Sequence, residues 1–248
     1  MNFITPEAFE AAKERLRDQS GVDEYRLLHN MLSSQPMCFN LFAPLAADLA
    51  LASRVFGLLL PSEIEAVTRV AFEFAPEPPS EYLNDRTAFD CFVEYVRPDG
   101  RRAFVGIETK LTEPFSQKLY DGAAYRRWAE RPDSPWPQAS WPRLAEVAHN
   151  QLWRDHLLAI AMTARPASPY ASGKLMLVRH PDDGACATVT KGYEGFLAPG
   201  DMTFLDCPLD RVVAACAAAC PGAGWVTEFR RRYLELAASE SDWQRAHR

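Results

Sequence analysis

The chain contains 248 residues, of which 48% are hydrophobic and 24% are charged. This balance is typical of a folded globular protein and argues against a disordered or fibrous chain. The formal net charge is 27 − 33 = −6 with neutral histidines, which excludes nonspecific coating of nucleic acid or of an anionic membrane through bulk charge. Any anionic partner therefore has to be held locally, by a metal ion or by a basic patch.

No stretch of the sequence is apolar for long enough to span a bilayer. The most apolar one, residues 41–60, is interrupted by Pro44, Asp48 and Arg54. The N-terminus lacks the basic start and the uninterrupted apolar run of a signal peptide. The six cysteines are too sparse for a disulfide scaffold and mostly have apolar neighbours, which indicates reduced core cysteines. We therefore expect a cytoplasmic protein that makes no membrane contact.

The first part of the chain is predicted to be mainly helical. Thr, Pro and Glu at positions 5–7 are typical of a helix N-terminus and predict a surface helix over residues 6–18. Residues 22–60 predict two more helices, of which the second, residues 37–59, is apolar on most faces and should be buried. Residues 66–74 alternate in polarity and are rich in β-formers, which predicts a strand.

Residues 88–96 and 102–110 predict two strands joined by a tight turn. The connection Arg97-Pro98-Asp99-Gly100 contains the Pro-Asp-Gly signature of a type I turn followed by a left-handed glycine. This turn pairs residues whose numbers sum to 198, so that one face of the hairpin is apolar and belongs in the core. The residues expected on that face are Phe89, Cys91, Val93 and Tyr95, opposite Thr109, Ile107, Val105 and Ala103.

The remainder of the chain alternates between helices and strands. An irregular excursion rich in Pro and Trp is expected over residues 129–143, followed by a helix over 145–164 and a strand over 174–179. Further elements are predicted as strands near 187–189 and 203–205 and as helices over 209–219 and 225–238. The central order of helix, three strands, helix and strand predicts an α/β fold with a mixed sheet flanked by helices.

The second face of the hairpin carries the candidate chemistry. The register places Asp90 opposite Glu108, with Lys110 two residues along the same strand. Facing carboxylates repel, and a bridging Mg²⁺ or Mn²⁺ ion would compensate, with the Thr109 carbonyl, water and phosphate oxygens as further ligands. Lys110 could then orient an attacking water and counter charge on a phosphoryl group. On spacing alone, a plain salt bridge from Lys110 on a solvated sheet face explains the pattern equally well.

This Asp…Glu-x-Lys arrangement resembles the signature of the PD-(D/E)XK nuclease superfamily, which has the restriction-endonuclease-like fold. The residue before Asp90 is Phe89 rather than proline, a variation that is usual in this superfamily. Four blocks are also similar to bacterial proteins described as restriction endonucleases of the superfamily: SSQPMCFNLFAPL (33–45), NDRTAFDCFVEY (84–95), GIETKLTEPF (106–115) and NQLWRDHLLA (150–159).

We expect a single domain over residues 1–248, in which the resemblance covers a nuclease-like core at about 25–180 and is followed by a C-terminal elaboration of strands and helices at about 185–240. The resemblance implies phosphodiester hydrolysis that depends on Mg²⁺ or Mn²⁺, with nucleic acid, expected to be DNA, as the substrate. The metal would be held by the two motif carboxylates and the nucleophile assisted by the motif lysine. Gln151 matches a glutamine that approaches the metal site in part of the superfamily.

A relative that has kept the fold but lost the chemistry, and serves as a binding or assembly module, is the alternative function. The presence of Asp90, Glu108 and Lys110 together favours the active enzyme, because a degenerate member would be expected to have lost at least one of them. A homodimer is compatible with either function.

Other candidate ligands have simpler explanations. Asp85 competes with Asp90 for the metal, but it precedes the strand and the hairpin register favours Asp90. Glu73 is a candidate extra carboxylate, although a solvated strand end is the simpler interpretation. His149 and His156 have no third ligand in a suitable position and are expected to be ordinary polar or core residues.

Basic and aromatic residues occur together in two places. Arg154 is predicted one helical turn from Gln151, where it could contact a phosphate or simply be solvated. Arg126 and Arg127 precede Trp128, and a Trp-rich loop follows them. Such a combination could stack on an unpaired base, but packing of the loop over the core is the simpler interpretation.

Overall fold

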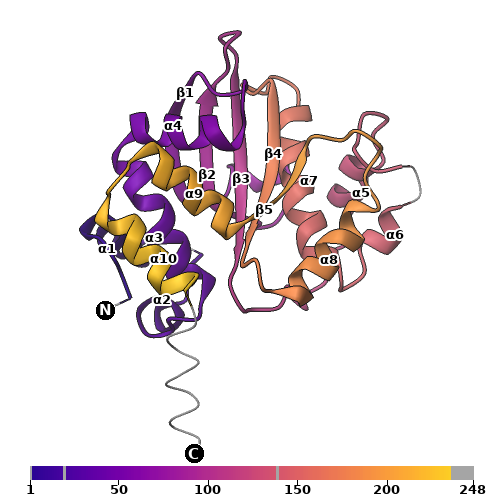
Figure 1. Cartoon of the computed structure of the whole chain (residues 1–248). Coiled ribbons are helices and arrows are strands. Elements are labelled where there is room, and N and C mark those ends of the chain that lie inside the picture. Colours follow the sequence, from indigo (N-terminus) through magenta and orange to yellow (C-terminus); the bar gives the residue numbers. More distant parts are fainter. Residues whose placement is uncertain (1, 19–20, 138–139, 236–248) are drawn as a thin grey trace, which may run out of the picture.

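The computed structural model describes residues 2–18, 21–137 and 140–235, and a five-stranded mixed sheet lies at its centre (Figure 1). The first three strands in the sheet are antiparallel neighbours, and the third, fourth and fifth are parallel neighbours. In spatial order the strands are β1 (Ala66–Phe74), β2 (Phe89–Val96), β3 (Arg102–Lys110), β4 (Ser172–Arg179) and β5 (Phe204–Pro208). The predicted α/β fold with a mixed sheet flanked by helices is therefore confirmed.

One face of the sheet is covered by helices from both ends of the chain. In Figure 1 the C-terminal helices lie beside the N-terminal ones, and their apolar side chains form one cluster with Cys91, Val93 and Ile107 of the sheet. The helices of this layer are α1 (Pro6–Arg17), α2 (Glu24–His29), α3 (Ser34–Ala47), α4 (Leu49–Leu59), α9 (Leu209–Ala219) and α10 (Gly224–Tyr233). The C-terminal segment is thus part of the core and not an appendage.

The opposite face of the sheet is also buried. A second apolar cluster joins Phe92, Phe104 and Leu177 of the sheet to the helices on this side, of which α7 crosses β3 and β4. The helices are α5 (Ala123–Ala129), α6 (Trp141–Leu144), α7 (Asn150–Ala164) and α8 (Gly184–Glu194). Burial on both faces explains the unbroken apolar run of residues 175–178 within β4.

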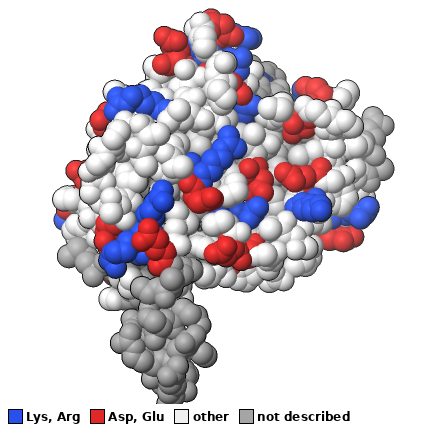
Figure 2. Space-filling view, viewed as in Figure 1, with Lys and Arg blue, Asp and Glu red and all other residues white. Residues whose placement is uncertain are grey.

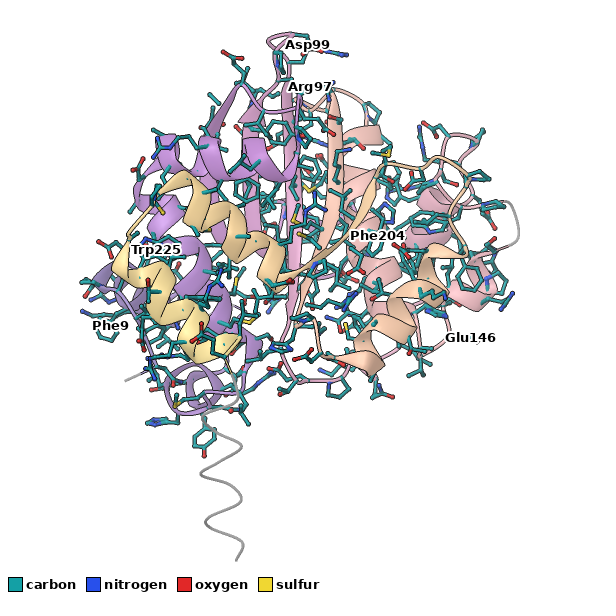
Figure 3. All side chains as sticks on the ribbon, viewed as in Figure 1. Phe9, Arg97, Asp99, Glu146, Phe204 and Trp225 are labelled. Atoms are coloured by element: carbon teal, nitrogen blue, oxygen red, sulfur yellow. The ribbon has the colours of Figure 1, made fainter. Side chains whose placement is uncertain are left out.

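The predicted hairpin is confirmed, and its register is confirmed from Cys91 to Val96; the pairs expected for Phe89 and Asp90 are not formed. Cys91 pairs with Ile107 and Val93 with Val105, so that paired residues sum to 198. Gly100 has φ +78°, in the left-handed region that favours glycine, and its N–H donates to the carbonyl of Arg97 at 2.8 Å. Figure 3 shows Arg97 and Asp99 at the tip of this hairpin.

The side-chain alternation predicted for β2 is wrong at its first residue. Phe89 packs in the cluster with Phe92 and Phe104, on the face opposite Cys91. The pairing of β2 with β3 ends at Cys91 and Ile107, and beyond this pair the side chain of Asp90 accepts from the backbone N–H of Thr109. The ring of Phe89 lies over Gly106, where a Cβ atom would be only 2.4 Å from the ring.

A methyl group at Gly106 should therefore destabilise the protein. We expect Gly106→Ala to lower the free energy of unfolding by about 1–3 kcal/mol, because the Phe89 ring has to move within a packed core. Gly57→Ala is the control: no atom lies within 4 Å of its added Cβ, and alanine in a helix should stabilise by up to about 1 kcal/mol. Urea denaturation measures both, and equal effects of the two substitutions would contradict the packing described.

Two of the predicted helices have different bounds in the structure. The single buried helix expected over 37–59 is divided at Asp48, whose carboxylate accepts from the N–H of Leu51 at 2.8 Å and so begins a new helix, α4. The helix expected over 145–164 begins only at Asn150. The side chain of Asn150 bonds to the carbonyl of Ala145 and to the backbone of Tyr120, which separates the preceding turns from the helix.

One predicted strand is a helix. Residues 187–189 lie inside α8, whose first turn is capped by Asp183 accepting from the N–H of Cys186 at 2.8 Å. The β-branched Thr188 and Val189 suggested a strand, but this cap and the packing of α8 override that weak preference. The last predicted helix is α10, which ends at Tyr233, and residues 236–238 of that prediction lie outside the described residues.

No single helix in the described ranges is long and apolar enough to cross a membrane. Helices α3 and α4 together have the required length and composition, but they are bent by 117° at Asp48. Their apolar side chains pack in the core against the sheet.

Candidate active site

The functional residues predicted from the sequence lie together at one end of the central strands β2 and β3, away from the hairpin turn. Because β2 and β3 are antiparallel and β3 and β4 are parallel, the end of β3 lies beside the start of β2 and the end of β4. Asp90 is the second residue of β2, and Glu108, Thr109 and Lys110 are the last three residues of β3. Ends of neighbouring strands are common positions for functional side chains in α/β sheets.

Asp90 is half-buried and is held by its neighbour on β3. Its Oδ2 atom accepts from the backbone N–H of Thr109 at 2.8 Å and from the hydroxyl of the same residue at 2.7 Å. Burial, and then the negative charge of Glu108, raise the pKa of Asp90 to about 7, against the opposing effect of the Thr109 hydrogen bonds and of Lys110. The carboxyl group is therefore fixed in place and close to its protonation midpoint at neutral pH.

Glu108, Lys110 and Gln151 form a connected group beside Asp90. The Nζ atom of Lys110 lies 3.0 Å from Oε1 of Glu108, and it also donates to Oε1 of Gln151 at 3.2 Å. The amide nitrogen of Gln151 donates to the same oxygen of Glu108 at 2.6 Å. The amide oxygen accepts a further bond from the N–H of Ser116 at 2.7 Å, which ties the loop after β3 to α7.

The salt bridge considered as the plain alternative is present, but it does not lie on a solvated face. The side chains of Glu108 and Lys110 are only 6% and 9% exposed. Burial alone would lower the pKa of Lys110, but the charges of Glu108 and Asp90 outweigh it and the pKa is raised, so that the ammonium form is held. A buried ion pair contributes little net stability, and its retention here is more informative about function than about folding.

The competing carboxylate Asp85 has a structural role. Its Oδ1 atom accepts from both the N–H and the hydroxyl of Thr87, and its Oδ2 atom accepts from the hydroxyl of Tyr125. These bonds hold the turn that leads into β2. The other predicted ligand, the carbonyl of Thr109, stays a prediction.

Two acidic residues near the site were missed or misjudged. Glu73 is half-buried with φ +46°, and burial followed by the charges of Asp90 and Glu108 raises its pKa well above the usual range, so it is not a solvated strand end. Asp155 is 1% exposed, and its Oδ2 atom has no hydrogen-bond partner among the described residues. Asp155 follows Gln151 by four residues, so both lie on one face of α7. This spacing is the sequence feature from which Asp155 could have been predicted.

Of the side chains considered as alternatives, His156 and two of the tryptophans are packed in the core, whereas a phosphate contact of Arg154 stays a prediction. His156 is buried, with its ring nitrogens 2.8 Å from the hydroxyls of Tyr193 and Thr203, and burial lowers its pKa to about 4. Trp128 and Trp136 belong to the apolar cluster beneath α7. Arg154 lies with its guanidinium 4.7 Å from the ring centre of Tyr120. All six cysteines are free thiols.

The side chains of the site can be compared with the ligands that Mg²⁺ or Mn²⁺ requires. In residues 2–18, 21–137 and 140–235, no three His, Cys, Asp or Glu side chains are arranged to hold an ion. Mg²⁺ does not require such a cage, because it is usually bound through one or two carboxylates together with water and substrate phosphate oxygens. Asp90 and Glu108 would supply two hard oxygen ligands. Burial, and then the charge of Glu108, raise the pKa of Asp90, and a bound cation would favour its ionised form against both effects. The residues present therefore fit the metal.

A mixed sheet between helices, with an aspartate at the start of one strand and Glu-x-Lys at the end of its neighbour, defines the restriction-endonuclease-like class of folds. A family model described as the PD-(D/E)XK nuclease superfamily matches residues 1–235. The chain belongs to this superfamily, whose members are nucleases that generally use divalent metals. No curated protein and no solved structure matches the chain.

Proposed function

We propose that this protein is a nuclease that hydrolyses phosphodiester bonds of DNA with the help of Mg²⁺ or Mn²⁺. Asp90 and Glu108 would hold the metal, with the carbonyl of Thr109 as a further ligand. Lys110 would assist the water nucleophile, and Gln151 would position Lys110.

The observation that supports this proposal most strongly is the buried contact among Glu108, Lys110 and Gln151 beside Asp90. Two carboxylates and an ammonium group within one partly enclosed site are costly unless a function retains them. The site also lies at the end of the central strands where loops can admit a substrate, whereas the hairpin turn is at the opposite end of these strands.

The roles of the side chains follow from their contacts. The bound cation would stabilise charge on the phosphate and favour ionisation of water. The ammonium group of Lys110 would donate a hydrogen bond to the attacking water and counter the charge that develops on the phosphoryl oxygens. Gln151 would keep this ammonium group directed, because its amide oxygen accepts from Nζ while its amide nitrogen is fixed by Glu108.

The charge distribution requires that DNA be held locally. On the face shown in Figure 2, Lys and Arg are interspersed with Asp and Glu and form no broad basic surface. With a net charge of −6, affinity for phosphate would have to come from the metal, from Lys110 and from single arginines. We therefore expect weak binding in the absence of a divalent cation.

The proposal is tested by incubating the full chain with Mn²⁺ and plasmid, linear duplex and single-stranded DNA. We expect cleavage of at least one of these substrates, and we expect Asp90→Ala and Glu108→Ala to abolish both cleavage and Mn²⁺ binding measured by calorimetry. The control is Asp99→Ala, an acidic residue of the same hairpin that lies at its exposed turn.

Two results would contradict the proposal in different ways. Unchanged Mn²⁺ affinity in both carboxylate variants would remove the metal site. Metal-dependent binding of DNA without cleavage of any substrate would instead support the alternative, a nuclease-like module that binds or assembles without catalysis.

A further inference from the structure

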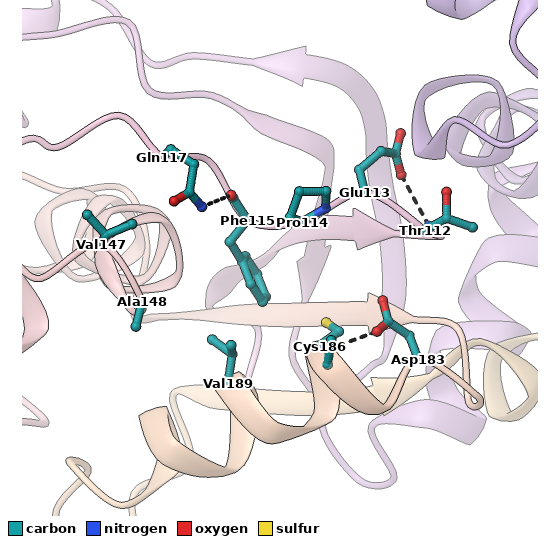
Figure 4. A pocket seen from close by; sticks show the side chains of 11 residues that line it. Thr112, Glu113, Pro114, Phe115, Gln117, Val147, Ala148, Asp183, Cys186 and Val189 are labelled. Carbon is teal, nitrogen blue, oxygen red and sulfur yellow. Dashed lines mark hydrogen bonds between the residues drawn. The ribbon is translucent and has the colours of Figure 1, made fainter.

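A pocket of about 230 Å³ is lined by residues that follow β3, among them Phe115 (Figure 4). Its walls come from the loop after β3, from the turn before α7 and from the first turns of α8. Figure 4 shows the side chain of Phe115 pointing toward Cys186 and Val189. The volume corresponds to roughly eight water molecules at about 30 Å³ each, which suits a single planar ring system and not a folded peptide segment.

The pocket shares a wall with the candidate active site. The ring of Phe115 lines the pocket, and the Nζ atom of Lys110 lies 5.2 Å from the centre of that ring. The next residue, Ser116, donates its N–H to Gln151. A phosphate held at Lys110 would therefore have its neighbouring nucleoside at the mouth of this pocket.

The chemistry of the walls selects against phosphate. Much of the lining is apolar, with Phe115, Val147 and Val189 among its members, and none of the described residues that line it is Lys or Arg. The charged groups are Glu113 and Asp183, which would repel an anion. A ring with apolar faces and an amino group at its edge is complementary to such walls, because bases stack on aromatic side chains and carboxylates accept from their amino groups.

The two carboxylates differ in their availability. Glu113 is committed to the protein, since it accepts from the N–H of Ser34 at 2.8 Å and pairs with Arg26. Within the described part of the chain, the hydrogen bond of Asp183 uses Oδ1, which caps α8 through the N–H of Cys186. Its Oδ2 atom is left to accept from a ligand, and the cap holds the carboxylate in a fixed direction.

We propose that this pocket binds one unpaired nucleobase next to the phosphate at the candidate active site, with the amino edge of the base at Asp183. The inference rests on the proposed function and specifies its substrate as single-stranded DNA, because a base in a duplex would first have to leave its stack. Adenine, cytosine and guanine carry a suitable amino group, and thymine does not.

The experiment measures binding, so that its result does not depend on cleavage. Fluorescence anisotropy compares a labelled cytosine-rich single strand with a strand of equal length that has abasic sites in place of the bases. We expect the wild-type protein to bind the abasic strand about 10-fold more weakly. Ala185→Trp, at the exposed mouth of the pocket, should lower the affinity for the normal strand to the abasic level and leave the affinity for the abasic strand unchanged.

Thr188→Trp is the matched control, because Thr188 is an exposed residue of the same helix that does not line the pocket. It should keep the full preference for the normal strand.

The proposal is overturned if the wild-type protein binds the two strands equally or binds neither, or if Ala185→Trp keeps the wild-type preference. Tighter binding to duplex DNA that carries a mismatched cytosine would overturn the single-stranded substrate while keeping the pocket. Failure of cleavage with intact base-dependent binding would count against the proposed nuclease and not against the pocket.

Discussion

Replacing Lys110 with alanine is expected to lower the rate of DNA cleavage by about 100-fold or more and to leave the affinity for Mn²⁺ within a few-fold of wild type. The expectation follows from the position of Nζ, which contacts Glu108 and Gln151 and supplies the buried cation closest to the proposed ligands. Loss of this ammonium group removes the stabilisation of charge on the phosphoryl group but leaves both carboxylates. Single-turnover cleavage assays and calorimetry separate the two effects.

Two further substitutions make this test specific. Lys110→Gln keeps a hydrogen-bond donor without the charge and should be nearly as inactive as the alanine variant. Lys118→Ala removes an exposed lysine of the neighbouring loop and should cleave at the wild-type rate, which controls for general attraction of DNA. Full activity in both Lys110 variants would remove the catalytic role assigned to this side chain.

The second large effect is expected on stability. Asp90→Asn should raise the free energy of unfolding at pH 8 by up to about 4 kcal/mol, which is the difference between a folded pKa of about 7 and the ordinary value of 3.8 at about 1.36 kcal/mol per unit. The asparagine oxygen can still accept from Thr109, so the hydrogen bonds of the site are kept. The same substitution should abolish binding of Mn²⁺.

The sign of the pH dependence follows from linkage. Because the folded protein binds the Asp90 proton more tightly than the unfolded chain does, protonation favours the folded state. This contribution is complete below about pH 4 and is lost as the pH rises through 7. The advantage of Asp90→Asn should therefore grow between these values and stay constant above them, as measured by urea denaturation without divalent metal.

The control for this prediction is Asp99→Asn. Asp99 pairs with Arg101 at the exposed turn, and the resulting hydrogen bonds lower its pKa to about 2, so its replacement should give no gain in stability at high pH. Addition of Mg²⁺ should stabilise the wild-type protein and not Asp90→Asn. A stability difference between wild type and Asp90→Asn that does not change with pH would contradict the electrostatic origin described for the site.

Local signals were sufficient for the hairpin and for part of the site. The Pro-Asp-Gly turn determines the register because its geometry allows only one pairing of the strands it joins, and this register brought Glu108 and Lys110 to the expected end of the strands. The resemblance to the superfamily indicated Gln151, which contacts both. The strand at residues 66–74 and the helix at 209–219 were also predicted correctly, because the spacing of apolar residues within each segment indicates its secondary structure.

The sequence by itself thus determined the hairpin register and most of the elements, and it placed the candidate residues Glu108 and Lys110 on the second strand of the hairpin, since these features depend on neighbours along the chain. Only the tertiary structure decided how deeply the salt bridge is buried, that Asp90 is held by Thr109, and that Glu73 and Asp155 lie nearby. It also decided that residues 187–189 are helical and that a pocket adjoins Lys110 through Phe115. Burial, desolvation and contacts between distant segments arise only when the two helical layers close on the sheet, and no local pattern encodes them.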